Sequence, residues 1–130
     1  MIAFDPPTSG VNAPRGRAIY VGAGPGDPEL LTLAAVAAFN GCDVVLADTV
    51  ELLDLLHHSS IHLADDAMVS SVDQLTEAAW ATPEERADLV RQAQLGGRTV
   101  VRLVPGDPFL DGGVTAEAAA LANAGVRFQV

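Results

Sequence analysis

The sequence predicts an α/β fold built on a five-stranded, mainly parallel sheet with helices on both faces. Short runs rich in Val, Ile and Leu alternate with longer segments of helical pattern, which favours parallel strands joined by helical crossovers. Two of the runs, 18–21 and 99–104, lead into loops that contain Gly-Asp-Pro. With 130 residues, of which 49% are hydrophobic, the chain is large enough for one core of ordinary domain size.

Local signals place each element. Strands are expected at 18–21, 43–47, 61–64, 99–104 and 126–130, of which 61–64 is the weakest. Helices are expected at 30–40, 51–57, 82–95 and 115–123. The third helix begins with a capping box, Thr82 to Glu85, that has Pro83 at its first helical position, and Gly41 and Gly125 are helix stops. The segment 65–81 leaves two alternatives, a helix through Trp80 or a mobile loop.

Composition and charge exclude several classes of function. Seven arginines, no lysine and 17 acidic residues give a net charge of −10, so the chain lacks the basic footprint of a nucleic-acid binder. No apolar run approaches the roughly 20 residues that cross a bilayer. Residues 1–17 have no export signal and are expected to form a flexible leader before a domain at 18–130. Cys42 has no partner for a disulfide and is expected to be an inert core thiol. We therefore expect a cytoplasmic protein.

The loop from Gly22 to Pro28 is the most informative segment. Alternating glycines that follow a strand and open into a helix let the backbone approach a small polar ligand. A dinucleotide fingerprint has the spacing G-x-G-x-x-G, whereas Gly22, Gly24 and Gly26 give G-x-G-x-G. Pro28 also removes an amide donor that a pyrophosphate would use. The loop therefore does not fit NAD.

A second loop, Pro105 to Phe109, follows the strand at 99–104. Ligands of an open parallel sheet bind outside the carboxyl ends of its strands, at the point where the strand order reverses. The two Gly-Asp-Pro loops are therefore expected side by side, in one shared site.

At these residues the sequence resembles the tetrapyrrole methylase family, in its uroporphyrinogen-III C-methyltransferase and precorrin methyltransferase branch. The resemblance covers Ala18 to Val130, and its first block is the most specific. Four blocks carry it: Tyr20 to Thr32, Asp43 to Asp48, Val100 to Leu103, and Gly106 to Phe109.

The resemblance implies an enzyme that binds S-adenosylmethionine between two α/β domains, acts on a small tetrapyrrole and forms a homodimer. It implies a second domain beyond Val130, so the isolated chain is expected to bind the cofactor weakly or not at all. Methyl transfer depends on positioning and on exclusion of water, so no catalytic residue and no metal ligand is assigned. The implied cofactor-binding residues are Pro25, Gly106, Asp107 and Pro108. The implied substrate-side residues are Gly24, Gly26 and Asp27.

The chain departs from the family pattern in its substrate loops. Val104 and Pro105 stand where the C-methyltransferases have Lys-Gly, and 111–113 lacks their arginine. A substrate rich in carboxylates needs fixed positive charge. The first hypothesis is the N-terminal domain of a tetrapyrrole C-methyltransferase. The alternative is a degenerate, non-catalytic module, fused for example to uroporphyrinogen-III synthase. Another substrate on the same fold, or an unrelated nucleotide-binding domain, stays open.

Other polar residues have two interpretations each. Asp27 orients the cofactor or serves only the turn, and Asp107 is assigned to the site. Asp48 presents an acid to a ribose or caps the helix at 51. Thr32 is expected inside its helix, where it ties the loop back. The histidines lack the spacing of a metal site, so a solvated helix end is preferred for them: His57, His58 and His62.

Overall fold

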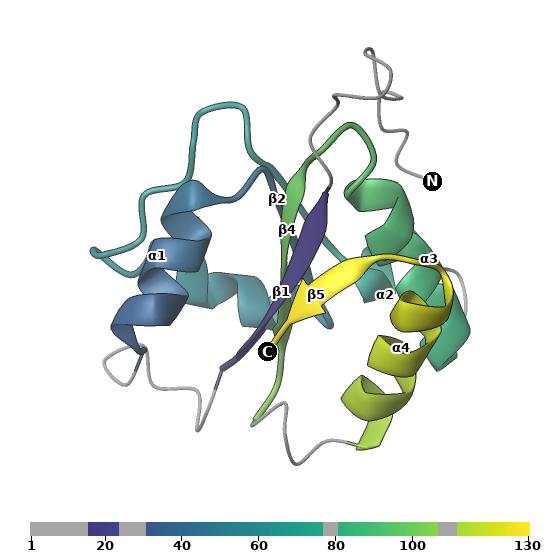
Figure 1. The fold of residues 1–130 in the computed structure, drawn as a ribbon. Coiled ribbons are helices and arrows are strands. Elements are labelled where there is room, and N and C mark those ends of the chain that lie inside the picture. The colour runs from purple at the N-terminus through teal and green to yellow at the C-terminus, as the bar shows by residue number, and fades with distance from the viewer. Residues whose placement is uncertain (1–15, 24–30, 77–80, 107–111) are drawn as a thin grey trace.

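A computed structural model describes residues 16–23, 31–76, 81–106 and 112–130. Five strands form one sheet in the order β3-β2-β4-β1-β5, and every neighbouring pair is parallel (Figure 1). The predicted fold class is confirmed. The strand order reverses beside β1, because β4 lies between β1 and β2.

The strands are β1 (Arg17–Gly22), β2 (Val44–Ala47), β3 (Met68–Ser71), β4 (Thr99–Val104) and β5 (Arg127–Gln129). The helices are α1 (Leu33–Gly41), the 3-10 helix η2 (Val50–His57), α2 (Val72–Leu75), α3 (Pro83–Ala93) and α4 (Gly112–Asn123).

The sheet separates two hydrophobic cores. Side chains of β4 alternate between them: Val101 and Leu103 pack with α1 and η2, while Val100 and Val104 pack with α3 and α4. Figure 1 shows α1 on one side of the sheet and the α3–α4 pair on the other. The fully buried strands explain the continuous apolar runs in the sequence.

Helix caps explain where two helices begin. Thr82 Oγ1 accepts a hydrogen bond from the Glu85 amide at 3.1 Å, and Pro83 occupies the first turn of α3, as the capping box predicts. Thr32 Oγ1 accepts from the Ala35 amide at 3.0 Å and caps α1. The prediction that Thr32 lies inside the helix is therefore wrong, because its hydroxyl satisfies a free amide at the helix start.

The predicted third strand at 61–64 is also wrong. Residues 61–64 have no regular structure; Ile61 is buried against α1 and η2, and the His62 amide donates to Asn40 Oδ1 at 2.6 Å. The strand next to β2 is instead β3, where Val44 pairs with Met68 and Ala47 with Ser71. The apolar residues of 61–64 cover α1 rather than extend the sheet. In the segment 65–81, β3 and the short α2 replace both predicted alternatives over 68–75, and residues 77–80 lie outside the described ranges.

Candidate ligand-binding edge of the sheet

Three strands end together at one edge of the sheet. Gly22 pairs with Val104, and the Ala23 amide donates to the Val104 carbonyl at 2.9 Å. The Asp48 amide donates to the Leu103 carbonyl at 2.9 Å. We call the residues directly after β1, β2 and β4 the carboxyl edge: Ala23, Asp48, Thr49, Pro105 and Gly106.

The sequence-predicted site residues fall largely outside the described ranges. Six of them are in this position: Gly24, Pro25, Gly26, Asp27, Asp107 and Pro108. Gly106 lies on the carboxyl edge with a φ of +68°, a conformation that L side chains rarely adopt, and a Cβ there would meet nothing within 4 Å. The positive φ thus explains why glycine occupies position 106, which is exposed to solvent.

Beneath the carboxyl edge lies a buried polar cluster that sequence reasoning missed. We call it the Arg102 cluster; its members are Tyr20, Asp48, Arg102 and Glu117. Arg102 and Glu117 are each only 1% exposed, and Tyr20 is 3% exposed. The cluster joins β1, the end of β2, β4 and α4.

All five N–H groups of Arg102 have acceptors inside the protein. Nε and Nη2 each donate to one oxygen of Glu117 at 3.0 Å, and Nη2 also donates to Asp48 Oδ1 at 2.5 Å. The two hydrogens of Nη1 face the carbonyls of Leu46 and Leu103, both at 3.4 Å. A guanidinium has five donors, so Arg102 has none left for an anionic ligand.

Burial and neighbouring charges together determine the pKa shifts in the cluster. Burial disfavours the charged form of Arg102, but the Glu117 and Asp48 carboxylates outweigh burial and raise the pKa of the guanidinium. Burial, followed by the adjacent Glu117 carboxylate, raises the pKa of Tyr20 well above its usual value. The Tyr20 hydroxyl therefore stays protonated and donates to Glu117. One guanidinium faces two carboxylates, which leaves one excess negative charge beside the carboxyl edge.

One signal in the sequence pointed to this cluster. Arg102 stands in the apolar run Thr99–Val104, and the strands of a parallel sheet are buried on both faces. An arginine at such a position requires buried acceptors. Asp48 supplies one, and it caps no helix: the N-cap residue of η2 is Thr49, whose side chain makes no capping hydrogen bond.

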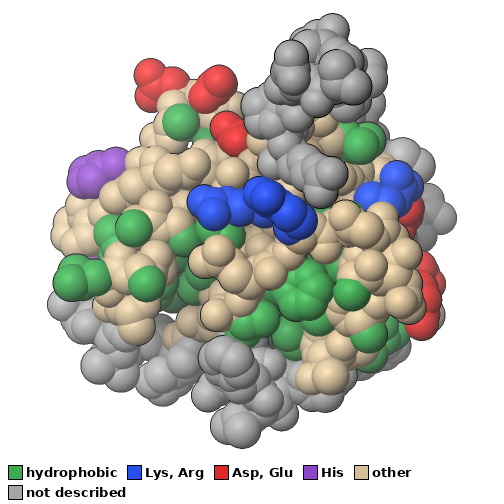
Figure 2. Space-filling view, viewed as in Figure 1, with side chains coloured by type: hydrophobic (Ala, Val, Ile, Leu, Met, Phe, Trp, Pro, Cys, Tyr) green, Lys and Arg blue, Asp and Glu red, His purple; other side chains and the backbone are tan. Residues whose placement is uncertain are grey.

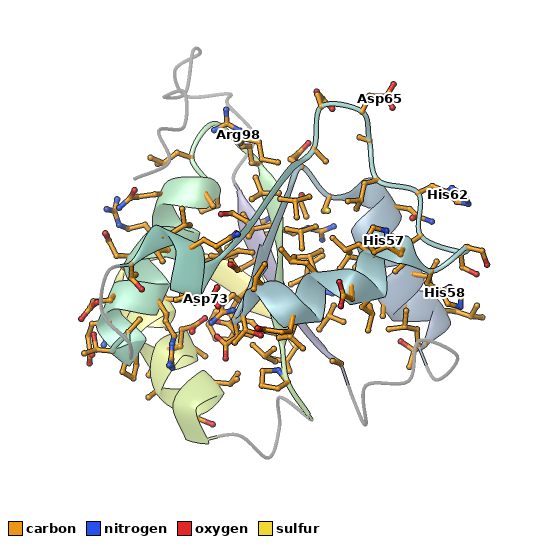
Figure 3. The ribbon with its side chains drawn as sticks, turned by 180° about the vertical axis from the view of Figure 1, so that it is seen from behind. His57, His58, His62, Asp65, Asp73 and Arg98 are labelled. Carbon is orange, nitrogen blue, oxygen red and sulfur yellow. The ribbon has the colours of Figure 1, made fainter. Side chains whose placement is uncertain are left out.

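The remaining candidate residues lie elsewhere. Figure 3 shows His57, His58 and His62 on the outer side of η2 and the loop that follows it. The described residues include no group of three His, Cys, Asp or Glu side chains that could hold a metal ion. Cys42 is buried as predicted, its thiol donates to the Phe39 carbonyl, and burial raises its pKa to about 11.

Comparison with known proteins agrees with the resemblance in the motifs. The family model described as Tetrapyrrole (Corrin/Porphyrin) Methylases matches residues 18–130. The chain belongs to this family. Among its relatives, a siroheme synthase of Gluconobacter oxydans is 40% identical over 118 residues, which are 88% of this chain and 24% of that protein. A uroporphyrinogen-III C-methyltransferase of Priestia megaterium is 34% identical over 115 residues, which are 88% of this chain and 47% of that protein.

Solved structures give the same result. A uroporphyrin-III C-methyltransferase from Thermus thermophilus superposes with a TM-score of 0.67 at 32% identity over 89% of this chain and 46% of that one. The same enzyme complexed with S-adenosyl homocysteine gives a TM-score of 0.61 at 35% identity, over 88% of this chain and 47% of that one. The chain thus spans less than half the length of these relatives. Within its described ranges, no helix is both long and apolar enough to cross a membrane.

Proposed function

We propose that this methylase domain is the N-terminal, cofactor-side part of an S-adenosylmethionine-dependent tetrapyrrole C-methyltransferase. The observation that carries the proposal is the pairing of Gly22 with Val104, which brings the roots of the two Gly-Asp-Pro loops together at the carboxyl edge. The proposed cofactor-binding residues are Pro25, Gly106, Asp107 and Pro108. The proposed substrate-side residues are Gly24, Gly26 and Asp27. Asp48, which lies between β2 and η2, completes the edge.

A specific observation favours a second candidate, a non-catalytic methylase domain with a structural or regulatory role. Among the described residues directly after β1, β2 and β4, which form the carboxyl edge, none is cationic. Arg102 has its donors occupied, and Arg17, Arg98 and Arg127 lie at the amino ends of their strands. Figure 2 shows arginine side chains at the surface where β1 and β5 begin, which is the end of the sheet opposite the carboxyl edge. A polycarboxylate substrate would find no free guanidinium on the described carboxyl edge.

Calorimetric titration of this 130-residue chain tests both candidates. A micromolar site that loses half of its binding free energy has a dissociation constant on the order of 1 mM, so we expect S-adenosyl homocysteine to bind in that range. The methyltransferase candidate predicts additional binding of uroporphyrin III in the presence of S-adenosyl homocysteine. The non-catalytic candidate predicts none. Micromolar binding of S-adenosyl homocysteine would refute the idea that this domain carries only half of the cleft.

We further propose that the protein is cytoplasmic and forms a homodimer. β5 lies at an edge of the sheet, where Phe128 is 36% exposed, and Val130, directly after the strand, is 45% exposed. Unpaired edge strands and exposed apolar side chains favour association. The net charge of −10 opposes association at low salt. Light scattering at moderate salt over a range of protein concentrations tests the assembly, and a strictly monomeric mass at high concentration would contradict it.

A further inference from the structure

The core-facing side of α3 begins with a charged residue. Arg86, Val90 and Ala93 have the spacing i, i+4 and i+7, so they share one face of the helix. Val90 and Ala93 are fully buried, and Arg86, in the first turn, is half-buried. A cation in the first turn of a helix is disfavoured by the helix dipole. Neither the packing of the core nor the electrostatics of the helix therefore explains an arginine at position 86.

The topology places Arg86 near the end of the sheet at which the strands end. The last turn of α3 leads to the opposite end, because the Arg98 amide donates to the Gln94 carbonyl at 3.1 Å and the Arg17 amide, where β1 begins, donates to the Arg98 carbonyl at 3.2 Å. α3 therefore starts on the side of the carboxyl edge. Long side chains of a helix point back towards its N-terminus, which directs Arg86 towards the carboxyl edge.

The guanidinium of Arg86 has no acceptor in the described part of the chain. Its Nε is buried and makes no hydrogen bond to any described residue. Within 16–23, 31–76, 81–106 and 112–130, Arg86 also forms no ion pair. A buried donor without an acceptor is rare in folded proteins and lowers their stability. An acceptor supplied by a ligand would remove this cost.

The other described arginines are not available at the carboxyl edge. Arg91 pairs with Asp88 at 2.7 Å, and the donors of Arg102 are occupied inside its cluster. Three more lie at the amino ends of their strands: Arg17, Arg98 and Arg127. The chain has no lysine. Among the arginines that the structure describes, Arg86 is thus the one on the carboxyl-edge side without an acceptor.

We propose that Arg86 binds a carboxylate of the tetrapyrrole substrate and supplies the positive charge that the carboxyl edge lacks. The proposal rests on the methyltransferase candidate of the proposed function. Nε and Nη2 of an arginine bind one carboxylate as a fork, as Arg102 does with Glu117 at 3.0 Å. S-adenosylmethionine also has a carboxylate, but its own ammonium group neutralises that charge. A substrate rich in carboxylates has no such internal cation.

Calorimetric titration of the 130-residue chain with uroporphyrin III, in the presence of S-adenosyl homocysteine, tests the proposal. We expect Arg86→Met to weaken this binding by about tenfold, the effect of one charge-assisted hydrogen bond. Arg91→Met removes the same charge from an exposed position of α3 and should weaken it by less than about twofold. Binding of S-adenosyl homocysteine alone should be unchanged in both variants. Unchanged uroporphyrin binding in Arg86→Met, equal weakening in the two variants, or a loss confined to S-adenosyl homocysteine would overturn the proposal.

Urea unfolding of the same variant separates a binding role from a structural one. Methionine at 86 continues the apolar face formed by Val90 and Ala93 and removes the unpaired donor. The unfolding midpoint of Arg86→Met should therefore equal or exceed that of the unsubstituted chain. A lowered midpoint would show that Arg86 serves the fold instead, and would overturn the proposal.

The Nε–H resonance of Arg86 tests the proposal without the tetrapyrrole. In ¹H–¹⁵N spectra, we expect this resonance to shift saturably when acetate replaces chloride at constant ionic strength, because acetate supplies the carboxylate alone. The Nε–H of Arg102, which donates to Glu117 at 3.0 Å, should stay in place. If the unsubstituted chain does not bind uroporphyrin III, the methyltransferase candidate fails and this measurement alone decides whether Arg86 is a carboxylate site. An Arg86 resonance that acetate does not move would overturn the proposal.

Discussion

Substituting Arg102 by methionine should be among the most destabilising single changes in this domain. The substitution leaves the Glu117 carboxylate, which is 1% exposed, without a cation, and removes the partner of Asp48. Removing one member of a buried ion pair costs roughly 3–5 kcal/mol, against a total stability of about 5–15 kcal/mol for a typical domain. With a urea dependence of about 1.5 kcal/mol per M, the unfolding midpoint should fall by roughly 2–3 M.

The double variant Arg102→Met, Glu117→Leu makes this prediction specific. It removes both buried charges, leaving Asp48, which water reaches, and the Tyr20 hydroxyl, which loses its acceptor. We expect the double variant to be more stable than Arg102→Met alone, in urea unfolding followed by circular dichroism. Arg91→Met, which breaks the exposed 2.7 Å pair with Asp88, should cost less than about 1 kcal/mol. Additive losses in the double variant would refute the idea that the buried Glu117 carboxylate depends on the cation of Arg102.

Three further predictions concern single positions. Thr82→Ala should lower the free energy of unfolding, measured by urea titration, by about 1 kcal/mol because it removes the cap of α3. Thr49→Ala, at a cap position without a side-chain hydrogen bond, should change it by less than about 0.5 kcal/mol. Equal losses in the two variants would contradict the role of the Thr82 cap. Gly106→Ala should lower the free energy of unfolding by about 1 kcal/mol because φ is positive at this residue. Gly41→Ala, where an added Cβ also meets nothing within 4 Å, should lower it by less. An unchanged stability of Gly106→Ala would show that the positive φ causes no strain. Burial raises the pKa of Cys42 from 9.0 to about 11, so the contribution of the buried thiol to the free energy of unfolding is fully present below pH 9 and is lost as the pH rises towards 11, by about 3 kcal/mol. In Cys42→Ala, the free energy of unfolding should therefore fall less steeply over this pH range. An unchanged pH profile would contradict the prediction.

Elements with a strong local signal could be predicted from the sequence. The capping box at Thr82 and the proline beside it identify the start of α3, because both act within one turn of the helix. The run Thr99–Val104 identifies a buried parallel strand because a near-continuous series of apolar side chains is typical of strands that are covered on both faces. The carboxyl edge followed from these strands, since parallel strands end at the same side of a sheet.

Elements that depend on tertiary contacts could not be predicted in this way. The run 61–64 has the composition of a strand, but Ile61 packs beneath α1 and η2, and β2 pairs with the less apolar β3 instead. Glu117 carried no signal by itself, because an acid in an Ala-rich helix is normally exposed. Only the fold brings it to Arg102, which lies 15 residues away along the chain.

The most direct test of the account is the location of bound S-adenosyl homocysteine on the ¹⁵N-labelled chain. We predict weak binding, on the order of 1 mM, with shifts concentrated at Ala23, Asp48 and Gly106 on the carboxyl edge. Saturable shifts centred on Arg17 and Arg127 at the amino ends of β1 and β5, or no shift at about ten times that concentration, would contradict it.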